Sequence, residues 1–257
     1  MLIHLIQANL STRYIGRKIE YDSWTHSTNQ DAWTLIDQGA SEGTVTVTDK
    51  QIKGKGRSGR LWVSFPGKSL TTSLILKPCV KNHLAGWFPL LTGIAIVDAL
   101  REFGVKAMLK WPNDIMAYGK KLGGILCESK IRGSLLEWTV IGIGLNVNEM
   151  QEELPADLNA TSIFLELSSF IQIELVLANI LNNIELLYDL LKENKDTEML
   201  RNYWTDRCNH VNKSVKFEID NDMQEGHFIG INNDGAAIII SDGIEKTYCS
   251  GDIHINP

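Results

Sequence analysis

The periodicity of the chain changes near residue 212, and this change limits the folds that the chain can adopt. Upstream, segments with a helical spacing of apolar residues alternate with strand-like segments. From residue 212 onward the chain consists of short strands separated by Asn-Asp, Asn-Asn-Asp-Gly and Ser-Asp-Gly turns, with nothing helical. We therefore predict an α+β fold with two domains, residues 1–211 and residues 212–257. The second is expected to be a small β-barrel that packs against the first.

The first domain carries clear helix and strand signals. Ser27 or Thr28 can cap a helix that runs to Gly39, and Pro89 can stand in the first turn of a helix that ends at Gly104. Two further helices and three strands are predicted at residues 169–194, 197–207, 44–48, 69–76 and 138–147. The strand at 44–48 alternates as a half-buried strand does, whereas the other two are typical of core strands.

Composition narrows the class of protein. The chain is long enough for one large domain with a small appendage, and 44% hydrophobic and 22% charged residues are ordinary for a globular protein. A formal net charge of -6 argues against a nucleic-acid partner. We expect no membrane association, because no apolar run reaches the length of about 18 residues that a span needs. The first ten residues lack the charged region and cleavage site of a signal peptide, so a cytoplasmic location is expected.

The four cysteines point to no metal or disulfide framework. Cys79, Cys127, Cys208 and Cys249 form no C-x-x-C pair, and no histidine stands beside them at a metal-ligand spacing. We interpret them as buried or half-buried reduced thiols, which also agrees with a cytoplasmic protein.

A glycine-rich basic segment at residues 51–62 is the most informative stretch of the sequence. From Lys50 to Arg60 it holds five cations, three glycines and no acid. Glycine lets backbone N–H groups approach a ligand closely, and the cations can offset the charge of a phosphate or carboxylate. The pattern favours an anion-binding loop, one that can fold over its ligand.

Two nucleotide-binding motifs fit this segment poorly, and one plain alternative stays open. Gly54, Gly56 and Gly59 match the spacing of the dinucleotide fingerprint, but the residues that follow look extended and end in Pro66, whereas the fingerprint should open a helix. A P-loop is excluded because no Gly-Lys-Ser/Thr closes the loop. Taken alone, the segment could also be a solvated surface loop.

A second cluster of motifs follows. KWPND at 110–114 places a lysine at the end of an apparent strand, and KLGGIL at 121–126 and GIGLN at 142–146 place glycines inside strands. Glycines at such positions mark places where another backbone or a ligand comes close. Each feature alone has an ordinary structural explanation, but their combination and order favour a ligand site.

Together these motifs strongly resemble the biotin protein ligase family over nearly the whole chain. The family's ordered motifs occur here as STN (27–29), GKGRSGRLW (54–62), KWPND (110–114), KLGGIL (121–126) and GIGLN (142–146). YCSGDI (248–253) is similar to the closing strand of the family's C-terminal module. The resemblance implies a catalytic domain with a mixed sheet and flanking helices, similar to class II synthetases, and an SH3-like C-terminal barrel.

The resemblance also implies an activity and its ligands. Members of the family activate biotin with ATP to biotinoyl-AMP, release pyrophosphate, and transfer biotin to a lysine of a carrier protein, such as the carrier subunit of acetyl-CoA carboxylase. ATP and Mg²⁺ are the implied cofactors, with no metal ligand that the sequence singles out. A homodimer is a further possibility that the sequence does not decide.

Site residues follow from the resemblance position by position. The implied biotin contacts are Ser27, Thr28, Gln51, Gly54, Lys55, Arg57, Trp62, Lys110, Gly123, Gly124, Gly142 and Gly144, and the implied ATP or adenylate contacts are Arg57, Arg60, Lys110 and Asn146. Lys110 matches the family's catalytic lysine, set between the biotin carboxylate and the α-phosphate, and Arg57 is the second catalytic candidate. Ser27, Thr28 and Gln51 match residues that hydrogen-bond the ureido ring.

Two departures from the family pattern shape these expectations. Position 55 is lysine where some members have arginine, which keeps the charge but loses the bidentate fork. The STN motif is already reached at residue 27, so we expect no N-terminal helix-turn-helix domain and a ligase that is not a repressor.

Two other functions remain open. A lipoate ligase or octanoyl transferase of related fold would act on similar carriers, although the basic loop and KWPND favour biotin and no cysteine is placed as an octanoyl nucleophile. A non-catalytic biotin- or nucleotide-binding regulator would be favoured if Lys110 or Arg57 were missing, and both are present.

Overall fold

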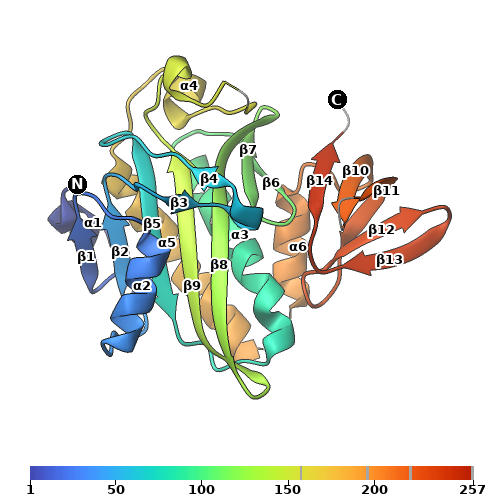
Figure 1. Cartoon of the computed structure of the whole chain (residues 1–257), viewed down its shortest axis with the longest axis horizontal. Coiled ribbons are helices and arrows are strands. Elements are labelled where there is room, and N and C mark those ends of the chain that lie inside the picture. Colours follow the sequence, from blue (N-terminus) through green and yellow to red (C-terminus); the bar gives the residue numbers. More distant parts are fainter. Residues whose placement is uncertain (157, 195–196, 220–221, 256–257) are drawn as a thin grey trace.

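A large mixed sheet forms the centre of the computed structural model, which describes residues 1–156, 158–194, 197–219 and 222–255. Its strands are ordered β1 (Ile19–Asp22), β2 (Val45–Thr48), β5 (Ser69–Leu76), β9 (Leu135–Asn146), β8 (Lys120–Arg132), β7 (Asp114–Ala117) and β6 (Ala107–Lys110) (Figure 1). Only β1 and β2 run parallel; the other neighbours are antiparallel. The sheet is therefore mixed, as the resemblance implies.

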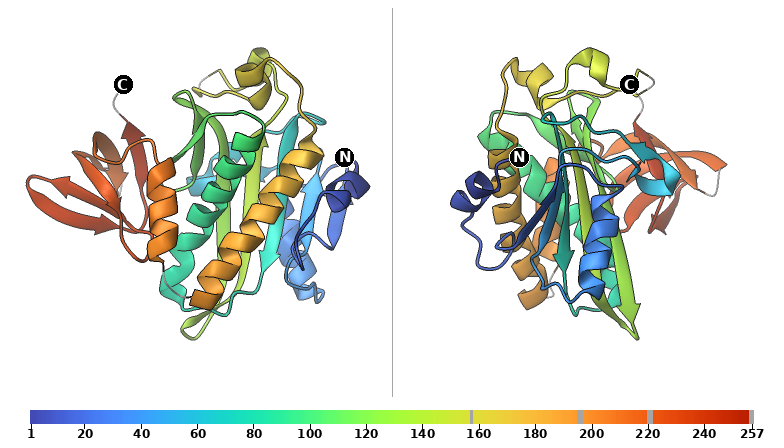
Figure 2. Two further views of the ribbon diagram at one scale, coloured as in Figure 1. Left: turned by 180° about the vertical axis from the view of Figure 1, so that it is seen from behind. Right: turned by 60° about the vertical axis from the view of Figure 1, so that its left-hand side comes forward.

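Helices cover the two faces of this sheet unequally. The long helices α3 (Trp87–Glu102) and α5 (Ile173–Asn194) cross one face side by side, with α6 (Glu198–Arg207) beyond α3 and α1 (Ile3–Ala8) against α5 (Figure 2). The opposite face carries only α2 (Thr28–Asp37) over β2, β5 and β9. The rest of that face is left for loops, and the short helix α4 (Ile163–Leu167) lies near one end of the sheet.

The helix α3, which lies on the sheet between α5 and α6, is apolar enough to resemble a membrane span. Residues Asn82–Glu102 comprise the 3-10 turn η2 (Asn82–Gly86) and α3, and they have the length and hydropathy of a span. The expectation that no segment reaches this length is therefore wrong. However, 72% of its most apolar window is buried inside the protein, which makes α3 the central core helix.

Most elements occur where the sequence predicts them, with two corrections. The strand at 44–48 is buried on both faces: Val45 and Val47 face the main core, while Thr46 lies under α2 and donates to the Thr28 carbonyl at 3.1 Å. The helix predicted from residue 169 begins at Ile173, because Asn148 hydrogen-bonds the main chain of Ile171 and holds the preceding residues outside the helix.

The cysteines are unpaired, as predicted, but not all are buried. All four thiols are free. Cys208 is buried and Cys127 is intermediate, whereas Cys79 and Cys249 are exposed, so the expectation of buried or half-buried thiols is wrong for these two.

The C-terminal part forms a separate antiparallel sheet. Its strands are ordered β13 (Ile244–Tyr248), β12 (Ala237–Ser241), β11 (Asp222–Ile231), β10 (Lys213–Ile219) and β14 (Asp252–Ile255). All five predicted strands are present. The SH3-like barrel and the boundary at residue 212 stay predictions.

The tail packs against the larger part through the β11–β12 turn. The Trp87 indole donates to the Asn233 carbonyl at 2.7 Å, and the Trp111 indole donates to the Gly235 carbonyl at 3.1 Å. Phe217 and Phe228 of the tail belong to the same buried cluster as the core of the large sheet. A single continuous hydrophobic core therefore joins the two parts.

Candidate active site

A cavity of about 870 Å³ opens on the face of the large sheet that α2 leaves uncovered. Strands β5, β9, β8 and β7 form its floor, and the basic segment 51–62 forms its roof. Within this segment, β3 (Gly54–Lys55) and β4 (Leu61–Trp62) pair on either side of the 3-10 turn η1 (Arg57–Gly59), and we call these residues 54–62 the ribbon. The wall is completed by residues 252–254 of the tail and by Pro155 and residues 158–160, which follow the 3-10 turn η3 (Gln151–Glu153). The volume suits a small-molecule site.

The register of the sheet fixes the floor of this cavity. Thr71 on β5 stands opposite Gly144 on β9, Gly144 opposite Gly124 on β8, and Gly124 opposite Asp114 on β7. Residues directly opposite each other on neighbouring strands point to the same face. These four therefore make one transverse row, with a hydroxyl at one end, two glycines in the middle and a carboxylate at the other end.

The absence of side chains at the floor glycines makes room for side chains that reach over them. A Cβ on Gly142 would overlap the Asn29 carboxamide, and a Cβ on Gly144 would overlap the Trp62 ring. A Cβ on Gly124 would lie 3.7 Å from the Lys121 Nζ. The prediction that these strand glycines mark the close approach of another backbone is confirmed for Gly123, where a Cβ would lie 2.7 Å from the Gly144 carbonyl; at Gly142 and Gly144 the close neighbour is a side chain.

One end of the cavity is polar and uncharged. Ser27 is the N-cap of α2 but makes no side-chain capping bond, so its buried hydroxyl is left for the cavity. The main-chain N–H and the hydroxyl of Thr28 both donate to the Gln51 Oε1, at 2.8 and 3.2 Å. These bonds fix the Gln51 amide so that its Nε2 remains a donor for a ligand. The three residues predicted to bind a ureido ring therefore lie together.

The other end is cationic and is organised around Asp114. The Lys121 Nζ lies 2.6 Å from the Asp114 Oδ1, and the Lys110 Nζ lies 3.5 Å from its Oδ2. Both lysines line the cavity. Lys110 also borders a small second pocket beside Trp204, whereas Lys121 stands over the floor at Gly124.

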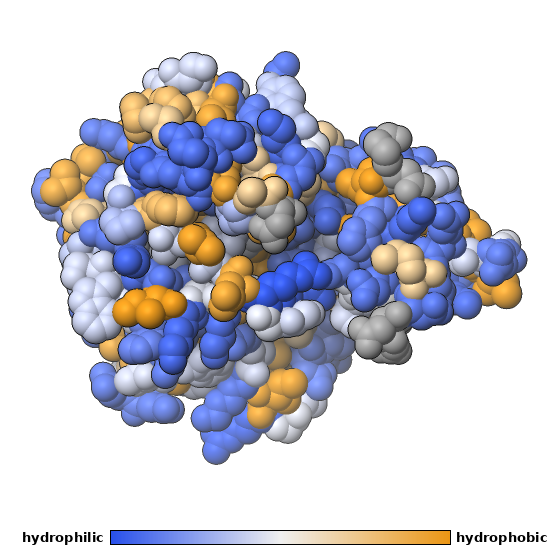
Figure 3. All heavy atoms as spheres, turned by 45° about the horizontal axis from the view of Figure 1, so that its top comes forward, coloured by the Kyte–Doolittle hydropathy of each residue, from blue (hydrophilic) through white to orange (hydrophobic). Residues whose placement is uncertain are grey.

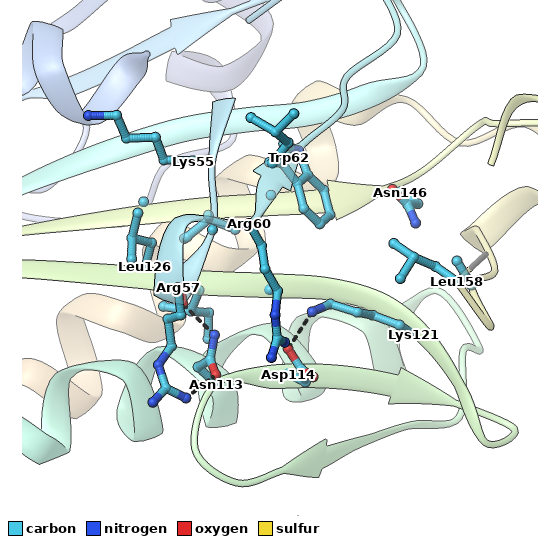
Figure 4. Close-up of a pocket in the computed structure, with 18 of the residues that line it drawn as sticks. Lys55, Arg57, Arg60, Trp62, Asn113, Asp114, Lys121, Leu126, Asn146 and Leu158 are labelled. Carbon is cyan, nitrogen blue, oxygen red and sulfur yellow. Dashed lines mark hydrogen bonds and ion pairs between the residues drawn. The ribbon is translucent and has the colours of Figure 1, made fainter. Parts of the chain in front are cut away.

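The two arginines of the ribbon reach toward this cationic end and toward the tail (Figure 4). The Arg57 Nη1 donates to the Asn113 Oδ1 at 3.0 Å and to the Gly251 carbonyl at 3.3 Å. Arg60 forms an ion pair with Asp252, which also lies 3.7 Å from Arg57. Among the described residues, five lysines and arginines and two carboxylates line the cavity, so the field of these residues favours an anion.

Three predicted residues take less part in the cavity. Lys55 is exposed and points away from Arg57, Arg60 and Lys121 (Figure 4). Gly54 and Gly123 are not among the residues that line the cavity. A Cβ on Gly54 would lie 2.8 Å from the Gln51 Nε2, and one on Gly123 would lie 2.7 Å from the Gly144 carbonyl, so backbone and side-chain packing accounts for both glycines.

Asn146, the last predicted contact, lies at the opposite side of the floor from Arg57 (Figure 4). Its amide donates to the Thr161 carbonyl at 2.9 Å, and it lines the cavity close to Leu158. Asn146 therefore lies beside the part of the wall that Leu158 belongs to, and its contact with the adenylate stays a prediction.

Several residues that line the cavity, Asp114 among them, have no role predicted from the sequence. Lys121 and Asn113 were already present in the KLGGIL and KWPND motifs, so the signal was available. Thr71 lies on a predicted core strand, where a threonine gives no sign of its face. Asp252 lies in the tail, and only the packing of the tail brings it to the ribbon.

A buried histidine lies behind Lys110 at the junction with the tail. His210 is fully buried, with its ring against Trp204 and Phe228 and its Nδ1 3.2 Å from the Cys208 Sγ. Burial, together with the smaller effects of the Lys110 and Lys213 charges, lowers the pKa of His210 to about 3. Burial also raises the pKa of the Cys208 thiol to about 12. Both groups are therefore neutral at pH 7.

No ready-made metal centre occurs among the described residues. No group of three or more His, Cys, Asp or Glu side chains is close enough to hold a metal ion there. Mg²⁺ commonly binds through one or two carboxylates together with substrate phosphates. The two carboxylates that line the cavity, Asp114 and Asp252, are both paired with cations. The described residues therefore single out no ligand for Mg²⁺.

Comparison with known proteins agrees with this geometry. Residues 20–146 match the model of the biotin/lipoate A/B protein ligase family. The bifunctional ligase/repressor BirA of Bacillus subtilis is 32% identical over 254 residues, which cover 97% of this chain and 78% of that protein. The biotin–[acetyl-CoA-carboxylase] ligase of Mycobacterium tuberculosis is 33% identical over 153 residues, covering 57% and 55% of the two chains.

A solved structure extends the likeness to the fold. The biotin protein ligase from Aquifex aeolicus, in complex with biotin and ATP, superposes with a TM-score of 0.77 at 27% identity, covering 93% of this chain and 99% of that one. Fold and site together define an α+β enzyme-like protein with an anion-binding cavity roofed by a basic ribbon. The chain belongs to the biotin protein ligase family.

Proposed function

We propose that the protein activates biotin with ATP to biotinoyl-AMP and transfers biotin to a lysine of a biotin carrier protein. The observation that carries this proposal is the polarity of the cavity. A neutral hydrogen-bonding end at Ser27, Thr28 and Gln51 is joined by an uncharged floor to a cationic end at Lys121 and Arg57. Biotin has the same order of groups: a neutral ureido ring, an apolar middle and a carboxylate.

The two ends of the cavity orient the substrate. At the neutral end, the Ser27 hydroxyl and the Gln51 Nε2 are free to bond a ureido group, because the Gln51 Oε1 is already held by Thr28. At the cationic end, the carboxylate meets Lys121 and Lys110. Apolar walls with a few placed polar groups are typical of such a site.

In the first step, a carboxylate oxygen of biotin attacks the α-phosphorus of ATP. A bond from oxygen to phosphorus forms, the bond to the leaving oxygen breaks, and pyrophosphate departs with the electron pair. Carboxylate and triphosphate repel each other, so catalysis rests on positioning and on fixed positive charge. Lys121, Lys110 and Arg57 supply that charge, and Asp114 and Asn113 hold them in place.

We propose Lys121 as an additional reaction lysine beside Lys110. Its Nζ stands over the floor glycine Gly124, between the Asp114 carboxylate and the open cavity. Lys110 is shared between the cavity and the buried junction at His210. Mg²⁺, if it enters with ATP, would add charge neutralisation on the phosphates.

In the second step, the ε-amine of a carrier lysine attacks the acyl carbon of biotinoyl-AMP. The new C–N bond forms as the C–O bond to AMP breaks, and the amine loses its proton. No covalent intermediate with the enzyme is required. The ribbon of residues 54–62 over the cavity would keep water off the anhydride until the carrier arrives.

The carrier has to approach the mouth of the cavity, where the exposed side chains are of mixed character. Exposed apolar residues on and beside the basic segment include Ile52, Leu61 and Val63. Figure 3 shows that apolar side chains on the face turned toward the viewer are scattered among polar ones, not gathered in one continuous patch. Single exposed apolar residues are ordinary at a protein surface, so we assign no docking residues.

The matched family model includes lipoate ligases as well as biotin ligases. The neutral end of the cavity favours biotin over lipoate as the substrate. The dithiolane ring of lipoate has no N–H or C=O group, so it would leave the buried Ser27 and Gln51 groups without partners. A site built to hydrogen-bond a substrate discriminates strongly against an analogue that lacks those groups.

The test is transfer to a carrier. The protein is incubated with Mg-ATP, labelled biotin and a purified biotin carrier domain, with parallel reactions that contain labelled lipoate or octanoate and a lipoyl domain. We expect label on the biotin carrier domain only, and on none of its variants that lack the acceptor lysine. Label on the lipoyl domain alone would support the related lipoate or octanoyl activity. Tight biotin binding without transfer would support a non-catalytic regulator.

A further inference from the structure

A row of hydroxyl side chains on β5 points to the face of the sheet that carries the cavity, and Thr71, the member of the row that lines the cavity, has no hydrogen-bond partner among the described residues. Ser69, Thr71 and Ser73 alternate along the strand and so point to the same face. The Ser73 hydroxyl lies 2.7 Å from both the Thr28 Oγ1 and the Asn29 Oδ1, and Ser69 contacts Glu149. The Thr71 Oγ1 makes no hydrogen bond to any described residue, although only 2% of the residue is exposed.

A second unpartnered polar atom lies over the same spot. The Trp62 ring stands on Gly144, the residue directly opposite Thr71, and its indole N–H is buried without a partner among the described residues. Opposed residues on antiparallel strands have Cβ atoms about 5 Å apart, so the two orphan groups flank one point of the floor. A buried polar group without a partner is costly, and such groups in a cavity commonly await a ligand.

The position of Thr71 and Trp62 along the cavity determines which part of a bound ligand would contact them. It lies between the neutral end at Thr28 and Gln51 and the cationic end at Asp114, in the row that runs from Thr71 across Gly144 and Gly124. If biotin lies as proposed above, its ureido ring and its carboxylate take the two ends. The ring sulfur then falls in the middle, beside Thr71 and Trp62.

We propose that Thr71 and Trp62 form a polar subsite for the ring sulfur, and that Thr71 is a specificity-determining residue for the oxidation state of that sulfur. This inference rests on the proposed function. A thioether sulfur is a weak acceptor and leaves both donors nearly unsatisfied. A sulfoxide oxygen is a strong acceptor that the Thr71 hydroxyl and the Trp62 N–H can both satisfy. The site is therefore suited to accept biotin sulfoxide as well as biotin.

The test compares two ligands on each of several variants. Calorimetric titration gives the affinity of the full-length protein for biotin and for each epimer of biotin sulfoxide. For the better-bound epimer, we expect the affinity relative to biotin to fall about three- to tenfold in Thr71→Val, which corresponds to the loss of one hydrogen bond. Trp62→Phe keeps a ring over Gly144 and removes the N–H, so it should show the same loss.

Two further variants separate a ligand contact from a structural effect. Thr71→Ser keeps the hydroxyl and should keep the wild-type ratio of the two affinities. Thr139→Val makes the same change at a buried position of β9 that does not line the cavity, and it should leave the ratio unchanged. Because the Thr71 hydroxyl has no hydrogen-bond partner among the described residues, Thr71→Val should not lower the melting temperature.

The outcomes distinguish this inference from the function beneath it. If the wild type binds biotin but Thr71→Val leaves the ratio of sulfoxide to biotin affinity unchanged, the subsite is wrong and the ligase assignment stands. If Thr71→Val lowers the melting temperature and weakens both ligands equally, Thr71 is structural and the inference fails. If the wild type binds neither biotin nor its sulfoxide, the proposed function fails and this inference fails with it.

Discussion

Arg60 of the basic ribbon forms an ion pair with Asp252 of the C-terminal sheet, so the roof of the cavity is tied to a part of the chain almost two hundred residues away. Arg57 strengthens the tie through the Gly251 carbonyl. The sequence holds no acid between Lys50 and Arg60, and this pattern predicts a loop that folds over an anionic ligand. In the folded protein, Asp252 supplies the missing negative charge.

Asp252→Asn should loosen the ribbon. An exposed ion pair contributes little, about 0.2–1 kcal/mol, so we expect trypsin to cut at Arg57 and Arg60 about two- to fivefold faster than in the wild type. Asp242→Asn changes an exposed acid elsewhere in the same module and serves as the matched control. Equal cutting in Asp252→Asn and the wild type would show that this contact does not hold the ribbon.

Biotin and ATP together should protect the ribbon from trypsin. The cations that line the cavity would then contact ligand anions as well as Asp252, so the segment becomes harder to open. Limited digestion with and without both ligands measures this directly. Equal cutting rates in the two conditions would argue that the ribbon is not a lid.

Lys110→Ala and Lys121→Ala should each impair adenylate formation more than folding. Both ammonium groups lie at the cationic end, and loss of one stabilising contact to developing charge costs about 10²- to 10³-fold in rate. We expect the larger loss for Lys121, which stands over the floor. Biotin-dependent pyrophosphate release is measured alongside the melting temperature, with the exposed neighbour Lys120→Ala as control. Near-normal pyrophosphate release with an unchanged melting temperature would show that the substituted lysine does not take part in the reaction.

His210 should make the protein less stable in mild acid. Its pKa is lowered from 6.5 to about 3 in the folded protein, so below pH 6.5 the unfolded chain takes up a proton that the folded protein does not. Stability is therefore unaffected above pH 6.5 and falls by about 1.4 kcal/mol for each pH unit between that value and the folded pKa.

Urea unfolding at pH 7.5 and 5.5 checks this effect. The wild type should lose about 1 kcal/mol more on acidification than His210→Phe, which keeps a ring between Trp204 and Phe228. His83→Gln, at an exposed histidine, should behave as the wild type does. The same pH dependence in His210→Phe would mean that the buried histidine is not the cause.

The C-terminal residues 212–257 contribute to the hydrophobic core of the whole protein, and this changes the expected effect of deleting them. The predicted biotin contacts all lie upstream of residue 212, so the sequence predicts that a chain without residues 212–257 keeps some biotin binding. The structure shows Trp87 and Trp111 bonded to the β11–β12 turn and Phe217 and Phe228 inside the common core. Truncation would expose these groups, so we now expect the shortened chain to unfold.

The sequence predicted the helices and strands better than it predicted which side chains contact each other in the folded protein. Helices such as α3 and strands such as β5 follow from local apolar periodicity, and Gly123 meets a neighbouring backbone as predicted, whereas the side chains that reach over Gly142 and Gly144 could not be named from the sequence. The pairing of Arg60 with Asp252 could not be predicted, because it depends on how the tail docks. The exposure of Cys79 and Cys249 likewise depends on tertiary packing that a cysteine pattern does not encode.

Exchange of radiolabelled pyrophosphate into ATP tests the central claim most directly, because it reports adenylate formation without any carrier protein. We predict that the wild-type protein with Mg-ATP catalyses this exchange when biotin is added, and not with lipoate or octanoate. Arg57→Ala and Lys121→Ala should reduce the biotin-dependent rate about 10²-fold or more. Exchange that does not depend on biotin, or that only lipoate or octanoate stimulates, would contradict the account.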